Sequence, residues 1–145
     1  MKNFLKLFGI VALAVVIGFT FVACDDGGGY GPGGGPSSYN PGGGGGGWPS
    51  SSVLSKWGIS GFNPTGASGY YWGEVSEGLV IMFNGTSATD QAVQRYFSNN
   101  GWSQEGNYES SDGTMLYYSK SPYFASYVRS TGSGAYTYSV TVIRD

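Results

Sequence analysis

A glycine-rich segment at residues 25–52 limits where this chain can fold. It reads DDGGGYGPGGGPSSYNPGGGGGGWPSSS, and prolines interrupt its glycine runs at four positions. A segment with so little apolar surface cannot offset the conformational entropy lost on folding, so we expect it to be disordered. This interpretation makes the segment a flexible spacer and restricts the folded domain to residues 53–145.

The residues before the spacer have the organisation of an export signal. Two lysines precede an apolar run over residues 7–23, which ends directly before Cys24, the only cysteine in the chain. A positively charged start, an apolar middle and small residues before a cut site are typical of a secretory signal. The sequence Phe21-Val22-Ala23-Cys24 resembles the lipobox of bacterial prolipoproteins.

This resemblance implies that residues 1–23 are removed and that Cys24 carries a lipid. Each buried methylene of an acyl chain contributes about 0.8 kcal/mol, so two or more chains give a stable anchor. The resemblance thus implies a membrane partner through Cys24, at the cell membrane or the outer membrane, with the domain in the periplasm or at the cell surface. An uncleaved helical anchor is the alternative, because the apolar run has 17 residues, near the lower limit for spanning a bilayer.

The composition from Cys24 onward excludes several classes of function. Nine acidic residues accompany five basic ones without a basic patch, so we expect no nucleic-acid binding. The chain has no histidine and its single cysteine is assigned to the anchor, which excludes zinc sites and histidine-based catalysis. We therefore expect no cofactor, no metal centre and no disulfide within the chain.

Hydrophobic periodicity predicts an α+β domain: an antiparallel sheet of four to five strands with one amphipathic helix packed on one face. A short helix near residues 51–57 remains ambiguous. The predicted strands are 70–75, 79–83, 114–120, 123–129 and 135–143. The continuous apolar run 79–83 indicates a central strand that is buried on both faces.

The amphipathic helix is the best-specified element. Ser87-Ala88-Thr89-Asp90 fits the pattern of a capping box at a helix start. Apolar residues then recur on one stripe as far as Phe97. Gly101 is placed to end the helix in a left-handed conformation, and we expect Trp102 to fold back on the helix end.

Aromatic residues are unusually frequent in the domain. From Val53 onward, 17 Phe, Tyr and Trp residues stand against 15 Val, Leu, Ile and Met residues. The strands 114–120 and 123–129 carry apolar groups on both faces, and one helix cannot cover both. We therefore hypothesise that Tyr117, Tyr123 and Tyr127 form an exposed platform for a glycan or an apolar peptide. The alternative is that they are ordinary strand residues, since tyrosine has a high β propensity.

Carboxylates offer the remaining catalytic chemistry. Glu105, Glu109 and Asp112 are expected in the loop after the helix. A weak Ca²⁺ site there is an open alternative, although the spacing matches no EF-hand loop. Glycosidase chemistry needs two carboxyl groups facing each other across a cleft, and no such pair is indicated.

The sequence as a whole predicts a lipid-anchored exported protein with a non-catalytic binding domain. Its partner would be an envelope protein, a glycan or peptidoglycan. A structural or assembly role within a cell-envelope complex is the alternative, and a carboxylate-dependent hydrolase is a third. Residues 53–145 carry no motif of a named family.

Overall fold

The computed structural model describes residues 47–131 and 137–145. The export signal, Cys24 and residues 25–46 of the predicted spacer lie outside these ranges, so the predictions made for them stay predictions. The elements in chain order are α2 (Ser51–Lys56), β1 (Ser68–Val75), β2 (Gly78–Asn84), α3 (Ser87–Asn99), β3 (Ser103–Ser110), β4 (Gly113–Lys120), β5 (Tyr123–Ser130) and β6 (Tyr138–Arg144). None of the helices in the described ranges has the length and hydropathy needed to cross a membrane.

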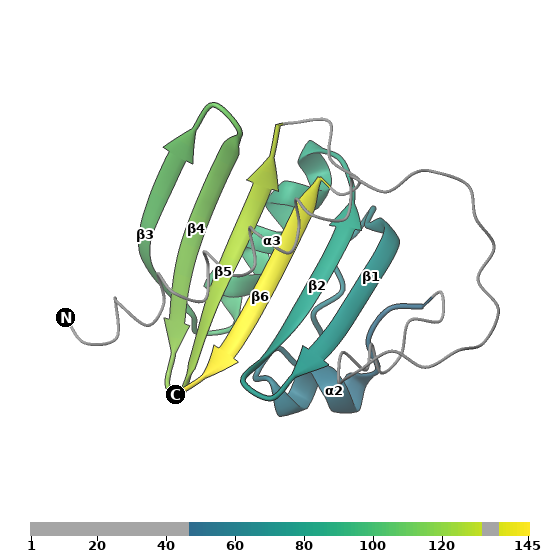
Figure 1. Cartoon of the computed structure of the whole chain (residues 1–145), viewed down its shortest axis with the longest axis vertical. Coiled ribbons are helices and arrows are strands. Elements are labelled where there is room, and N and C mark those ends of the chain that lie inside the picture. The colour runs from purple at the N-terminus through teal and green to yellow at the C-terminus, as the bar shows by residue number, and fades with distance from the viewer. Residues whose placement is uncertain (1–46, 132–136) are drawn as a thin grey trace, which may run out of the picture. The chain divides into compact units, whose positions relative to one another are not determined.

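The strands form one antiparallel sheet with the order β1-β2-β6-β5-β4-β3 (Figure 1). The predicted α+β class with an antiparallel sheet is confirmed. The predicted strand count is wrong, because the described residues contribute six strands rather than four to five. The last strand crosses back between β2 and β5, which joins the hairpin before α3 to the meander after it.

The strand that was missed is β3, with the sequence SQEGNYES. Nearly all of its residues are exposed, so it has none of the apolar alternation by which strands are predicted. It lies at the sheet edge, and its register with β4 shifts between Gln104 and Gly106. Charged side chains and a bulge on an edge strand are typical protection against pairing with another chain.

Helix α3 begins and ends close to where the sequence predicts. Its N-cap is Thr86, one residue before the predicted cap, and the Thr86 amide donates to the Thr89 side chain over 3.1 Å. Gly101 has the expected positive φ of 75°. The Trp102 amide donates to the Phe97 carbonyl over 3.2 Å, and the two rings meet edge to face at 5.3 Å, which confirms that Trp102 folds back on the helix end.

Both helices of the described part, with the segment between α2 and β1, pack on one face of the sheet (Figure 1). Aromatic rings dominate the contact: Phe97 of α3 stacks on Tyr118 of β4 at 4.4 Å and also meets Phe62. Aliphatic residues of β2 and β6 complete the core between the layers. The helix therefore docks through Val93 and Phe97 of the predicted stripe, and Thr89, which the sequence places on the polar side, is also buried.

The folded unit starts before the predicted boundary at Val53. Trp48 donates its indole N–H to the Phe62 carbonyl over 2.6 Å and packs against Tyr70 and Phe83. The sequence did not predict this contact, because the glycines before Trp48 give the segment the composition of a spacer. Trp48 consequently fixes where the chain enters the fold.

Candidate functional site

The strand register divides the sheet into two faces. One face packs against the helices and carries, among others, Ile81, Tyr127 and Val140. We call the opposite face the open face, because no helix of the described residues packs on it (Figure 1). Its larger side chains, assigned from register, are Tyr71, Val80, Met82, Tyr108, Met115, Tyr117, Phe124, Val128 and Ile143.

The open face is apolar and carries almost no charge. Hydroxyl residues of β5 and β6 lie among the apolar ones, and Glu105 at the β3 bulge is its one carboxylate among the described strand residues. Most of its large side chains keep intermediate exposure, and Tyr108 is 61% exposed. An antiparallel sheet with one face in water normally alternates between apolar and polar residues. This face departs from that pattern, as expected for a surface that meets a partner.

The prediction that strand 79–83 is buried on both faces is wrong. Leu79, Ile81 and Phe83 are fully buried on the helix face. Val80 and Met82 alternate with them onto the open face and keep intermediate exposure. These two apolar side chains therefore lie on the open face and not in the core.

The structure does not bring the three predicted platform tyrosines together. Tyr117 lies on the open face, where burial, reinforced by the neighbouring Tyr108, raises its pKa. Tyr123 and Tyr127 lie on the helix face, since they pair with Arg144 and Val140 of β6. The hypothesis of one exposed platform made by these three residues is therefore corrected. Alternation along β5 places Tyr123 and Tyr127 on one face, and the pairing of Tyr117 with Ser126 places Tyr117 on the other face.

Tyr127 instead belongs to a polar network between α3 and the sheet. It is 1% exposed, and its hydroxyl donates to the Asp90 carboxylate over 2.9 Å. Arg129 donates to the other oxygen of Asp90 over 3.0 Å, and Gln94 donates over 2.9 Å. Tyr127 and Arg129 tie the first turn of α3 to β5, and Gln94 supplies a third donor from the helix itself, so we assign this network to structure.

Buried and half-buried tyrosines make the folding stability fall at alkaline pH. Burial and the hydrogen bond to Asp90 raise the pKa of Tyr127, and burial raises the pKa of Tyr96 to about 12. Above about pH 10 the unfolded chain loses tyrosine protons that the folded chain retains. The unfolded state then binds fewer protons, so stability decreases by up to about 1.4 kcal/mol per pH unit for each such tyrosine.

Urea unfolding from pH 8 to pH 11.5 measures this slope. We expect Tyr127→Phe to be less stable at pH 8 but to decline less steeply above pH 10, because one titrating group is removed. Ser98→Ala alters an exposed side chain of α3 that does not titrate in this range and serves as the control with the wild-type slope. Equal slopes for Tyr127→Phe and the wild type would show that the Tyr127 hydroxyl is not enclosed.

Tyr123 lies beside a cleft at the end of the sheet that carries the C-terminus. Its hydroxyl donates to the Lys56 carbonyl over 3.1 Å, and the Arg144 guanidinium lies 5.9 Å from its ring centre. Gly58 makes this packing possible, because a Cβ there would come within 2.6 Å of the ring. The side chain of Tyr123 therefore helps to hold α2 against the sheet.

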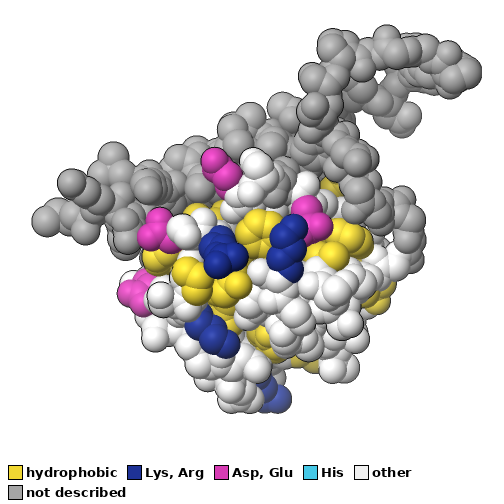
Figure 2. All heavy atoms as spheres, turned by 90° about the horizontal axis from the view of Figure 1, so that it is seen from below, with side chains coloured by type: hydrophobic (Ala, Val, Ile, Leu, Met, Phe, Trp, Pro, Cys, Tyr) yellow, Lys and Arg dark blue, Asp and Glu magenta, His cyan; other side chains and the backbone are white. Residues whose placement is uncertain are grey.

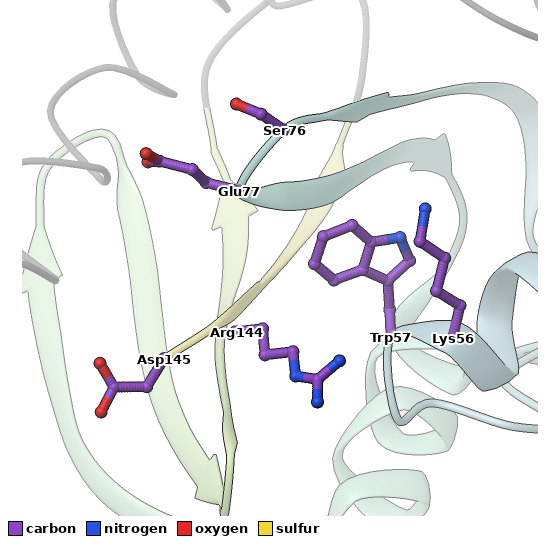
Figure 3. Close-up of a pocket in the computed structure, with 6 residues that line it drawn as sticks. All are labelled: Lys56, Trp57, Ser76, Glu77, Arg144 and Asp145. Atoms are coloured by element: carbon purple, nitrogen blue, oxygen red, sulfur yellow. The ribbon is translucent and has the colours of Figure 1, made fainter.

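The cleft has a volume of about 320 Å³ and mixed charge (Figure 3). Its lining residues are Lys56, Trp57, Ser76, Glu77, Arg144 and Asp145. Arg144 points toward Trp57 and Lys56, whereas the two acids point away (Figure 3). Figure 2 views the molecule from this end and shows basic side chains among apolar ones. The arrangement suits a small carboxylate, but the acids nearby lower the net attraction.

Glu74 already binds Lys56 and the Trp57 indole at the edge of this cleft. Its Oε1 accepts from the Trp57 indole over 2.6 Å and from Lys56 over 3.0 Å. The Trp57 hydrogen bond, followed by that of Lys56, lowers the pKa of this carboxyl. Glu74 is thus an ionised structural partner.

The predicted acidic loop is not a loop. Glu105 and Glu109 lie on β3, and Asp112 lies in the turn to β4. The bulge places Glu105 beside Ser119, to which it is hydrogen-bonded, while Glu109 pairs with Thr114 on the other face. Within the described residues no cluster of three potential metal ligands is found.

The residues that sequence reasoning missed are those of the open face outside β4 and β5. The alternation of β6, with Ser139 and Thr141 opposite the core residues, was a usable signal, whereas Tyr108 in a polar strand gave none. No family model matches this chain, and comparisons with curated proteins and with solved structures also return no match.

Proposed function

We propose that this protein is a lipid-anchored exported protein whose α+β domain is a non-catalytic binding module. The module docks through the open face on a protein surface of the cell envelope. The lipobox resemblance at Cys24 supports the anchor, and the open face supports the docking. The observation that carries the proposal is that a broad, nearly uncharged apolar sheet face has no helix packed on it in the described structure.

The shape of the face favours a protein partner. Sites for small ligands are concave and enclose most of the ligand surface. The open face presents side chains from neighbouring strands of one sheet, and the described cleft lies at the sheet end instead. Interfaces between proteins are broad and have apolar centres depleted of charge. A glycan or peptidoglycan partner is the alternative outcome of the test.

Photo-crosslinking of the full chain in a bacterial host tests this function. A benzophenone amino acid replaces Met115, which is half-buried on the open face, or Gln91, which is exposed on α3. We expect discrete protein adducts from position 115 and none from position 91. Labelling with an alkyne analogue of palmitate is expected for the wild-type chain and not for Cys24→Ala, which also loses the adducts.

Three outcomes would contradict parts of the proposal. A chain that is bound to the membrane but not labelled would indicate that the anchor is an uncleaved helix and not a lipid. Adducts that a muramidase converts to smaller products would indicate peptidoglycan as the partner. Absence of adducts from Met115 and from a second open-face position, Val80, would exclude docking through this face.

A further inference from the structure

We infer that the partner on the open face is a second copy of this chain. The inference rests on the proposed function, because it names the occupant of the same surface. The two copies pack sheet against sheet, with the helices on the outside of the pair. Each copy thereby covers the apolar residues that the other leaves without a helix.

The charge of the face is compatible with its own copy. An interface between identical surfaces places like charges near each other, which is costly when the surface is charged. Acids outnumber bases in the chain from Cys24 onward, yet the open-face strand positions carry Glu105 alone, at an edge. The centre of the face can therefore meet its copy without electrostatic repulsion.

The size of the face matches one side of a stable interface. The strands have seven or eight residues. At about 3.3 Å per residue and about 4.8 Å between strands, a six-stranded face measures roughly 25 Å by 25 Å. This flat area of roughly 600 Å² per copy gives about 1,200 Å² for the pair, the lower end of the range for specific complexes. Side-chain relief adds to it, so the open face is large enough for a small specific interface.

The distribution of side chains is self-complementary about the middle of the sheet. The middle lies between β6 and β5, with β2 and β4 at equal distances on either side. One row across the strands runs Met82–Ser139–Val128–Met115. A two-fold axis along the midline, parallel to the strands, places Met82 of one copy over Met115 of the other and Ser139 over Val128.

The next row repeats the arrangement with small residues at the centre. It runs Val80–Thr141–Ser126–Tyr117, and the two central residues are small and buried. The same axis places Val80 over Tyr117 of the other copy. Small central residues flanked by larger ones allow two sheets to approach to about 10 Å. The larger side chains of both rows then face each other across the pair, Met82 with Met115 and Val80 with Tyr117, while Val128 faces the small Ser139.

Sedimentation equilibrium of the full chain in density-matched detergent tests the inference. We expect a dimer for the wild type, and for Val128→Arg a dissociation constant raised at least about a hundredfold. The reason is that two arginines would be buried at the centre of the pair without partners. Gln91→Arg adds the same charge on the exposed side of α3 and is expected to leave the dimer unchanged.

Circular dichroism of each variant separates dissociation from unfolding. If Val128→Arg does not fold, Met115→Lys, nearer the sheet edge, is used in its place with the same expectation. A wild-type chain that stays monomeric at 100 μM, or a dimer that both variants leave intact, overturns the inference. In the first case, photo-adducts from Met115 with a different envelope protein would preserve the proposed function, and their absence would remove both.

Discussion

Replacing Phe97 by alanine is expected to lower the free energy of unfolding by about 3–5 kcal/mol. Phe97 is fully buried at the centre of the contact between α3 and the sheet. Its ring stacks on Tyr118 at 4.4 Å with an interplanar angle of 10°, and it meets Trp102 edge to face. Truncation removes these contacts and leaves a cavity between rigid rings that collapse poorly.

Urea denaturation followed by tryptophan fluorescence measures this loss. Ser98→Ala is the matched control, because Ser98 is the next residue, is exposed, and donates only to a carbonyl one turn back. We expect Ser98→Ala to change stability by less than about 0.5 kcal/mol. A loss below about 1.5 kcal/mol for Phe97→Ala would be inconsistent with this docking of the helix.

Replacing Asp90 by alanine is expected to cost about 2–4 kcal/mol of stability. The Asp90 side chain is 12% exposed and holds the Tyr127 hydroxyl and the Arg129 guanidinium. Without the carboxylate, the Tyr127 hydroxyl loses its hydrogen-bond acceptor inside the core. The side chain of Arg129 is 44% exposed and regains water, which keeps the cost below that of a fully buried ion pair.

Two further variants show whether the cost arises from the buried hydroxyl. Gln94→Ala removes the exposed donor to the same carboxylate and is expected to cost less than about 1 kcal/mol. Adding Tyr127→Phe to Asp90→Ala removes the unsatisfied hydroxyl, so the double variant is expected to lose less than the sum of the single changes. Strict additivity would show that Asp90 and Tyr127 are not coupled.

Much of the fold could be predicted because local signals were strong. The start of α3 near Ser87 and its end near Gly101 followed from cap chemistry that acts within a few residues. The alternation of Tyr138, Val140 and Val142 marked a strand with one buried face. In contrast, β3 had no apolar signal, and its strand conformation is supported by hydrogen bonds to β4.

The candidate site was only partly predictable. The sequence indicated that one helix cannot cover both faces of an aromatic-rich sheet, and the structure has such an open face. The sequence could not assign residues to it: Tyr117 lies there, but Tyr123 and Tyr127 do not. Periodicity gives the alternation of side chains within a strand, whereas pairing with neighbours decides which half of them is buried.

By itself, the sequence determined the α+β class, the position of the main helix and its caps, and the strands with clear periodicity. These features depend on interactions between residues close together in the chain. The tertiary structure alone decided the sixth strand, the entry of Trp48 into the core, and the face on which each tyrosine lies. The entry of Trp48 and the faces of the tyrosines depend on segments far apart in sequence, because Trp48 contacts Phe83 and Tyr127 reaches Asp90. Strand β3 depends instead on pairing with the adjacent strand β4, which its own composition does not indicate.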